Sequence, residues 1–229
     1  MSSVRLPRLY CIVDAGCFAG EQDRTAAVGR FTRELIAGGA TLIQYRNKSG
    51  NAREMISDAR EMVRVIEALH GQRPTTTDQR LPPTTDHRPL FIMNDRADLC
   101  LVSGFDGVHV GQDDLSPEAV RKIVGNQLWT GVSTHNPEQL AVADKTSANY
   151  VAVGPVYSTS SKQNPDPVIG LDGVRRAREL TRKPLVAIGG ITRQNCRAVL
   201  DAGADSVAVI SDLLKDPRKV VQEFLRLLS

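Results

Sequence analysis

The sequence of 229 residues contains no long apolar run. A membrane-spanning helix needs roughly 20 consecutive apolar residues, and no stretch approaches that length. The first nine residues also lack the apolar core of a secretory signal. We therefore expect a cytoplasmic protein that does not enter a membrane.

Aromatic residues and excess charge are also scarce. The chain has one Trp, four Tyr and five Phe, and its 29 basic residues nearly balance 26 acidic ones. This composition argues against a basic nucleic-acid-binding surface and against a base-stacking platform. Small local groups of cations can still bind a small anion. We expect small-molecule substrates and no nucleic-acid partner, and the composition leaves a homo-oligomer open.

Cysteine is present only in isolated positions, at Cys11, Cys17, Cys100 and Cys196. No two of them have the CxxC spacing of zinc sites and thioredoxin-like proteins. Reduced thiols of a cytoplasmic protein are the simpler interpretation.

Short apolar runs alternate with longer amphipathic stretches along the whole chain. We interpret eight of these runs as buried strands: residues 9–13, 41–45, 90–93, 107–110, 129–132, 150–153, 185–188 and 206–210. Helix starts are marked by a capping residue followed by Pro, at Pro117, Pro137 and Pro217. The pattern predicts a (β/α)8 barrel, with a doubly wound open sheet as the alternative.

Two features favour the barrel, formed as a single domain over residues 1–229. The alternation of apolar runs and amphipathic stretches continues along the chain without a change in composition. In addition, no GxGxxG follows the first predicted strand. One segment, residues 72–88, is rich in Thr, Pro, Arg and Asp and contains a near-duplication. Because it precedes a strand, we interpret it as a loop insertion on the face opposite the barrel's active face.

Polar side chains gather at the predicted carboxyl ends of the strands. Gly189-Gly190 and Ser211 follow the last two strands, where barrels commonly bind phosphate through backbone N–H groups. Asp95 and Asp114 follow neighbouring strands, and their carboxylates could share one Mg²⁺.

Cations lie next to this acidic pair in barrel order. Arg46 and Lys48 follow the second predicted strand, and together with Mg²⁺ they could neutralise a pyrophosphate. His109 and His135 also lie near strand ends, but a lone His there is as often structural as catalytic.

These residues together resemble the thiamine-phosphate synthase family, over essentially the whole chain. The resemblance is carried by six stretches: Gln44-x-Arg46-x-Lys48, Asn94-Asp95, His109-Val110-Gly111-Gln112-Asp113-Asp114, Gly131-Val132-Ser133, Gly154-Pro155-Val156-Tyr157-Ser158-Thr159 with Lys162, and Gly189-Gly190-Ile191. At the end of the first strand the family usually has Thr-Asp, whereas Val13-Asp14 stands here, which leaves the role of this strand end open.

The resemblance implies a transferase that joins 4-amino-5-hydroxymethyl-2-methylpyrimidine pyrophosphate to a thiazole phosphate. It implies that the pyrimidine pyrophosphate is held by Gln44, Arg46, Lys48, Asn94 and Lys162, with Mg²⁺ on Asp95 and Asp114. It places His109 against the pyrimidine ring and Ser133 in contact with the reacting pyrimidine, and it makes Ser133 and Lys162 the catalytic pair. It assigns the thiazole phosphate to Thr159, Ser161, Gly190, Ile210 and Ser211.

Two other functions remain alternatives. A thiazole tautomerase on the same barrel would keep the phosphate loops but would have no use for Mg²⁺ or for cations around a pyrophosphate. A non-catalytic binder of thiamine phosphate would not need the whole set of charged groups.

The position expected for residues 72–88 yields a prediction. Replacing the segment with a short Gly/Ser linker should leave turnover within a few-fold of wild type, because the active face lies at the other end of the barrel. Steady-state kinetics of the folded variant measures this, and complete loss of activity would contradict the assignment.

Overall fold

The computed structural model describes residues 6–71, 88–159 and 166–229, and these form a closed barrel of eight parallel strands in sequence order. The strands are β1 (Leu9–Asp14), β2 (Leu42–Arg46), β3 (Leu90–Asn94), β4 (Gly107–Val110), β5 (Trp129–Thr134), β6 (Tyr150–Val153), β7 (Leu185–Ile188) and β8 (Ser206–Val209). Because β1 pairs with β8, through Leu9 and Val207 among others, the open-sheet alternative is wrong and the barrel is confirmed.

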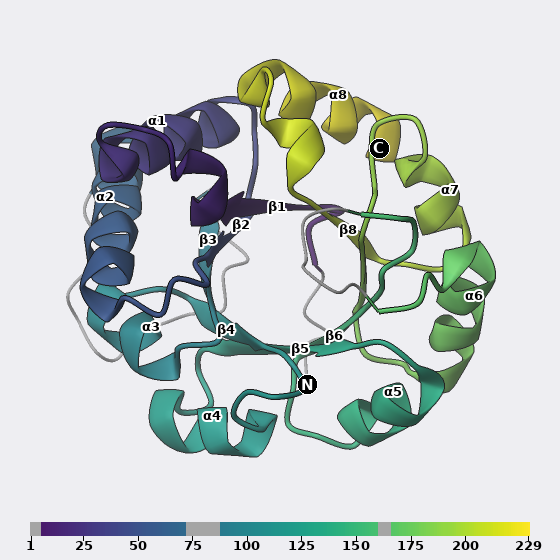
Figure 1. The fold of residues 1–229 in the computed structure, drawn as a ribbon. Helices are drawn as coiled ribbons and strands as arrows, with labels where there is room; N and C mark the ends of the chain where they lie inside the picture. The colour runs from purple at the N-terminus through teal and green to yellow at the C-terminus, as the bar shows by residue number, and fades with distance from the viewer. Residues whose placement is uncertain (1–5, 72–87, 160–165) are drawn as a thin grey trace.

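Helices follow each strand and surround the barrel (Figure 1). They are α1 (Arg24–Ala37), α2 (Ala52–His70), α3 (Ala97–Ser103), α4 (Pro117–Val124), α5 (Pro137–Asp144), α6 (Gly170–Leu180), α7 (Cys196–Asp201) and α8 (Pro217–Leu228), with 3-10 turns η1 (Ala15–Phe18) and η2 (Ser211–Leu213). Across the three described ranges, no helix combines the length and the apolar character that a membrane crossing requires.

Helix starts agree with the capping signals in the sequence. Ser116, Asn136 and Asp216 each accept a hydrogen bond from the backbone N–H three residues later, and Pro occupies the next position each time. The turns η1 and η2, by contrast, have no periodic apolar pattern, because each is only three or four residues long. They fall directly after β1 and β8, at the rim that bears the polar side chains.

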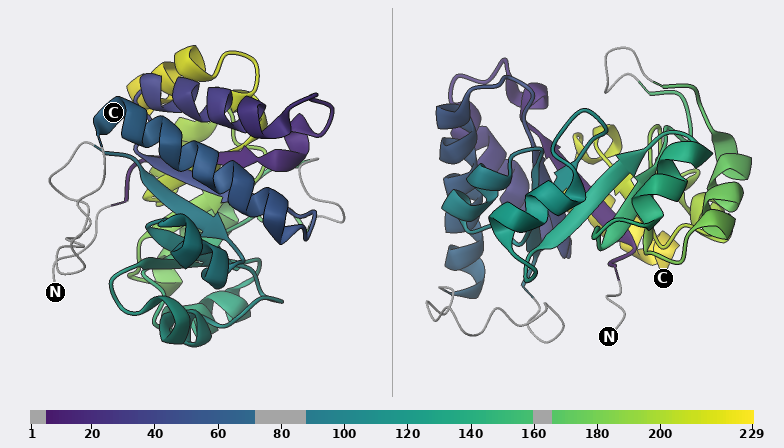
Figure 2. Two further views of the ribbon diagram at one scale, coloured as in Figure 1. Left: turned by 90° about the vertical axis from the view of Figure 1, so that its left-hand side faces the viewer. Right: turned by 90° about the horizontal axis from the view of Figure 1, so that it is seen from below.

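Alternation along the strands separates two apolar layers. On β1, Leu9, Cys11 and Val13 belong to the larger cluster, which also contains apolar residues of the surrounding helices. Figure 2 shows these helices lying outside the strands. Tyr10 and Ile12 point to the other side and join the cluster inside the barrel. Successive strand residues face opposite sides of a sheet, so this alternation follows from extended backbone.

Three side chains tie neighbouring strands together at the amino end of the barrel. Asp106, Asn149 and Asp205 directly precede β4, β6 and β8, and each carboxylate or amide oxygen accepts a backbone N–H from the preceding strand at 2.8 Å. The donors are Phe91, Thr130 and Leu185. These bonds satisfy N–H groups at the strand starts and fix the register of three strand pairs.

Inside the barrel, Gly131 of β5 leaves room for a tyrosine ring. It is in register with His109 on one side and with Tyr150 on the other. A Cβ atom at this position would lie 2.1 Å from Cζ of Tyr150. Because the Tyr150 side chain is fully buried, its ring has no free space into which to move.

Gly131→Ala should therefore destabilise the protein by about 1–3 kcal/mol, the usual cost of overpacking a filled core. Chemical denaturation measures the change. Gly20→Ala is the matched control, since a Cβ there meets nothing within 4 Å, and it should leave stability nearly unchanged. Equal midpoints for wild type and Gly131→Ala would show that the ring is not confined as described.

Candidate active site

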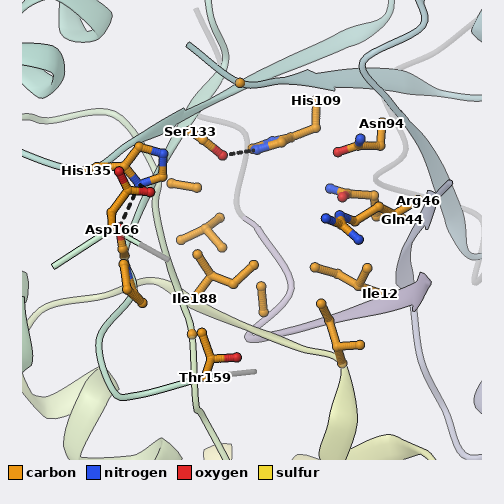
Figure 3. A pocket seen from close by; sticks show the side chains of 18 of the residues that line it. Ile12, Gln44, Arg46, Asn94, His109, Ser133, His135, Thr159, Asp166 and Ile188 are labelled. Carbon is orange, nitrogen blue, oxygen red and sulfur yellow. Dashed lines mark hydrogen bonds and ion pairs between the residues drawn. The ribbon is translucent and has the colours of Figure 1, made fainter. Parts of the chain in front are cut away.

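A cavity of about 450 Å³ opens at the carboxyl ends of the strands. Its lining includes every sequence-predicted site residue that falls within the described ranges: Gln44, Arg46, Lys48, Asn94, Asp95, His109, Asp114, Ser133, Thr159, Gly190, Ile210 and Ser211. Figure 3 labels Gln44, Arg46, Asn94, His109, Ser133 and Thr159 among them. Parallel strands end at one rim, which explains how residues from seven strands and their following loops meet. Ser161 and Lys162 lie outside the described residues.

Arg46 reaches the cavity from the end of β2 and forms an ion pair with Asp14, at the end of β1. The other Asp14 oxygen accepts the backbone N–H of Gly16 at 3.0 Å and so caps η1. Two strand ends thereby hold the guanidinium. The strand-1 end, whose role the sequence left open, orients a cation of the cavity.

Lys48 and Asp95 form a second ion pair, with 2.6 Å between Nζ and Oδ2. Asp95 has a left-handed backbone with φ of 64°, and its N–H donates to the carbonyl of His109 at 2.7 Å. This conformation is uncommon for residues other than Gly, and it occurs at functional sites more often than elsewhere.

Asp114 approaches Asp95 from the loop after β4. Burial raises the pKa of Asp95, Lys48 opposes this effect, and a hydrogen-bonding contact with Asp114 raises the pKa further. Asp114 itself accepts the Gly111 N–H at 2.8 Å, so its carboxylate is held in the loop. The two carboxyl groups therefore share one small region of the rim, as their places in the sequence predicted.

The donor set at this place suits a divalent cation that also binds phosphate. Within the described ranges, no cluster of three or more His, Cys, Asp or Glu side chains could hold a metal by itself. Mg²⁺, however, is commonly held by one or two carboxylates while phosphate oxygens and waters complete its octahedron. Two adjacent carboxylates whose mutual repulsion already raises a pKa fit that arrangement.

The side-chain amide of Asn94, at the end of β3, lacks a hydrogen-bond partner among the described residues, since its Nδ2 is buried and has no acceptor there. Buried polar groups are rarely left unpaired, and each exception needs an explanation. A ligand oxygen in the cavity, beside Arg46 and Lys48, would satisfy this amide.

The opposite side of the cavity is formed by the loops after β6, β7 and β8. Gly189 and Gly190 have φ of 103° and 62°. A Cβ would lie 2.5 Å from Pro155 Cβ at the first position and 2.5 Å from the Ser158 carbonyl oxygen at the second. Only glycine fits both requirements. The Gly pair thus lets the β6 and β7 loops approach closely, which brings Thr159 to the same cavity as Gly190 and Ser211.

A buried polar chain crosses the barrel beneath the cavity. Gln44 Nε2 donates to Tyr10 Oη at 2.9 Å, and the Tyr10 and Tyr150 hydroxyls are 2.9 Å apart. Tyr150 Oη lies 3.0 Å from His109 Nδ1, and His109 Nε2 lies 2.8 Å from Ser133 Oγ. The last of these contacts is drawn in Figure 3.

Burial keeps the members of this chain uncharged. It lowers the pKa of His109 to about 4 and raises the pKa values of Tyr10 and Tyr150 well above the usual tyrosine value. The imidazole is therefore neutral at physiological pH. A neutral His has one donor and one acceptor nitrogen.

Sequence reasoning missed several residues of the cavity. Tyr10 was hidden inside an apolar run, where only its hydroxyl distinguished it from core residues. His135, which carried only a weak signal, also lines the cavity; its Nδ1 lies 2.8 Å from the Gly154 carbonyl oxygen and 3.5 Å from Asp166 (Figure 3). Gln112 donates to the Ser133 carbonyl at 2.6 Å.

The chain is similar in sequence and in structure to known proteins. The family model described as thiamine monophosphate synthase matches residues 76–213. The thiamine-phosphate synthase of Koribacter versatilis is 56% identical over 227 residues, which cover 99% of this chain and 98% of that protein. That of Chloroflexus aurantiacus is 39% identical over 204 residues, covering 89% and 83%.

Among solved structures, the thiamine phosphate pyrophosphorylase from Pyrococcus furiosus superposes with a TM-score of 0.76 at 30% identity. The match covers 96% of this chain and 95% of that one. Sequence and structure thus confirm the resemblance drawn from the motifs. The chain belongs to the thiamine-phosphate synthase family, the transferases of thiamine biosynthesis.

Proposed function

We propose that this chain joins 4-amino-5-hydroxymethyl-2-methylpyrimidine pyrophosphate to a thiazole phosphate, giving thiamine phosphate and pyrophosphate. One observation carries the proposal. A single cavity is lined by two groups suited to anions, with Arg46, Lys48 and Asn94 in one and Gly190 and Ser211 in the other. A transferase that binds one pyrophosphate and one phosphate requires both.

The pyrophosphate would lie against the first group. Arg46 and Lys48 contribute positive charge, and the unpartnered amide of Asn94 contributes a donor. Lys162 is proposed to join them and to act in catalysis as a further point charge. Asp95 and Asp114 would hold Mg²⁺, which when bound neutralises charge on the pyrophosphate.

The pyrimidine would occupy the space above the buried polar chain. There Gln44 and His109 would contact the ring, and Ser133 would contact the reacting part of the pyrimidine. An electron-rich aminopyrimidine can stabilise a developing cation at its CH2 group, so a dissociative departure of pyrophosphate is chemically reasonable. The residues then need to hold the reactants in line and to stabilise the leaving group.

The thiazole phosphate would sit at the second anion place. Thr159, Ser161 and Ser211 would offer hydroxyl groups, and backbone at Gly190 and Ile210 would approach the phosphate closely. This position fixes the thiazole nitrogen relative to the CH2 group. The nitrogen is already a nucleophile, so the cavity does not need a strong general base for the bond-forming step.

The alternatives have less support from the geometry. A thiazole tautomerase would have no use for a carboxylate pair beside two cations, yet Asp95 and Lys48 are in direct contact at the rim. We further propose that residues 1–229 act as one barrel domain in the cytoplasm, on small molecules and without nucleic acid or membrane. A homo-oligomer would be compatible with a cavity built from one chain's strand ends.

The acidic pair gives a sharp prediction. Asp95→Asn and Asp114→Asn each keep the size of the side chain but remove a negative charge, so Mg²⁺ binding weakens. Turnover should fall by at least about 100-fold, the effect of losing one key electrostatic contact. Pyrophosphate release, measured with both substrates across a Mg²⁺ titration, checks this, and added Mg²⁺ should restore part of the activity.

Asp113→Asn is the matched control for these variants. Asp113 precedes Asp114 in the same loop and also lines the cavity, but it is not one of the proposed ligands. Its amide should leave the Mg²⁺ dependence within a few-fold of wild type. Unchanged activity and Mg²⁺ dependence in both ligand variants would refute the metal assignment and favour the tautomerase.

A further inference from the structure

We infer that Tyr10 and Tyr150 are positioning residues for this reaction: with Gln44, they hold His109 as the Nε2–H tautomer, so that the Ser133 hydroxyl donates its proton into the cavity. The inference deepens the proposed function and rests on it for the identity of the ligand. Neither tyrosine was among the residues expected from the sequence or its resemblance.

The inference begins from an uninterrupted chain of hydrogen bonds. Gln44, Tyr10, Tyr150 and His109 are all buried, with exposures of 4%, 1%, 0% and 7%. Within the described residues, the two tyrosine hydroxyls form hydrogen bonds only with each other, Gln44 and His109. Because these groups are buried, water has little access to them and cannot readily pair with a donor or acceptor that lacks a protein partner.

The direction of the chain follows from counting protons. Gln44 Nε2 is a donor, so Tyr10 Oη accepts from it. The single proton of Tyr10 can then go only to Tyr150 Oη, 2.9 Å away. Tyr150 in turn has only His109 Nδ1 left as an acceptor for its own proton.

His109 Nδ1 consequently carries the lone pair, and the ring proton resides on Nε2. That proton points to Ser133 Oγ, at 2.8 Å. Ser133 accepts it, and the hydroxyl proton of Ser133 is left for a partner in the cavity, since within the described residues its side chain bonds to His109 alone. In the opposite direction, Tyr150 would donate to Tyr10, and the Tyr10 hydroxyl proton would face the Gln44 NH2 group. The Tyr10 hydroxyl would then be a buried donor without an acceptor.

Packing holds this chain in place. The Tyr150 and His109 rings are stacked, with centroids 5.5 Å apart and an interplanar angle of 25°. Tyr10 meets Tyr150 edge-on, with centroids 6.1 Å apart. Trp129 packs on Tyr150 from another side, and Gly131 leaves space for the ring.

The direction of these hydrogen bonds determines which pyrimidine can bind next to Ser133. A donor at Ser133 matches a ring nitrogen with a free lone pair, as in a 4-aminopyrimidine. The corresponding oxo compound carries a proton on one ring nitrogen, and at that nitrogen it would present a donor to the Ser133 donor. A site built to hydrogen-bond one partner rejects an analogue that leaves its polar groups unpaired.

Nitrogen NMR of protein labelled with 15N-histidine tests the tautomer without substrate. Protonated and unprotonated ring nitrogens give well-separated resonances, and the His109 signals are those lost in His109→Gln. We expect a lone pair at Nδ1 and a proton at Nε2 in the wild-type protein. A proton at Nδ1 would show that the chain runs the other way and would overturn the inference.

Tyr150→Phe and Tyr10→Phe test the positioning role. Tyr150→Phe removes the donor to His109 Nδ1 and should convert the defined tautomer into a mixture, whereas Tyr10→Phe leaves Tyr150 with His109 Nδ1 as its only acceptor and should keep the tautomer. Each should also lower kcat/KM for the pyrimidine pyrophosphate about tenfold, as for loss of one hydrogen bond, with the KM for thiazole phosphate unchanged. Retention of the wild-type tautomer in Tyr150→Phe, or of the wild-type kinetics in both variants, would overturn the role.

Tyr45→Phe is the matched control. Tyr45 is another fully buried tyrosine of the barrel wall, but its hydroxyl donates to Asp58 on α2 at 2.6 Å, outside the cavity. This variant should lose stability while keeping the His109 tautomer and the kinetic constants. Failure of the wild type to release pyrophosphate would instead contradict the proposed function, since the NMR measurement needs no turnover.

Discussion

The pairing of β1 with β8 closes the sheet, and the site depends on that closure. Register on both sides of β1 places Asp14 beside Arg46 and Cys11 beside Val209. All eight strands are parallel, so in the closed barrel their carboxyl ends form a single rim. Groups far apart in sequence, such as Arg46 and Ser211, then line one cavity.

Charge is arranged at this rim so that most of it is partnered. Asp14 holds Arg46, and Lys48 holds Asp95, before any ligand arrives. Asp114 adds a second carboxylate next to Asp95, so the cluster favours an additional cation. Preformed ion pairs of this kind keep long side chains in position and reduce reorganisation when an anion binds.

Much of the fold could be predicted from the sequence because local signals were strong. Eight short apolar runs marked the strands, and the Pro-containing caps marked α4, α5 and α8. The rim residues could be predicted as well, since strand ends in a barrel share one face. Asp95 and Asp114 were paired on that reasoning, and the two carboxyl groups lie close enough for Asp114 to raise the pKa of Asp95.

The features that could not be predicted from the sequence depend on contacts between different strands of the barrel. Tyr10 and Tyr150 read as core residues, and only three-dimensional pairing shows their hydroxyls to be 2.9 Å apart. Asp14 could not be assigned because its partner Arg46 lies on another strand. The need for Gly at position 131 likewise becomes visible only through the Tyr150 ring on the neighbouring strand.

We propose that one cavity binds two anions on opposite sides, and that the pyrimidine lies above the buried polar chain. A crystal structure of the protein with thiamine phosphate, pyrophosphate and Mg²⁺ tests it most directly. We expect pyrophosphate to lie against Arg46, Lys48 and Asn94, and the phosphate of the product to lie at Gly190 and Ser211. Thiamine phosphate bound in the reverse orientation, or pyrophosphate outside the cavity, would contradict it.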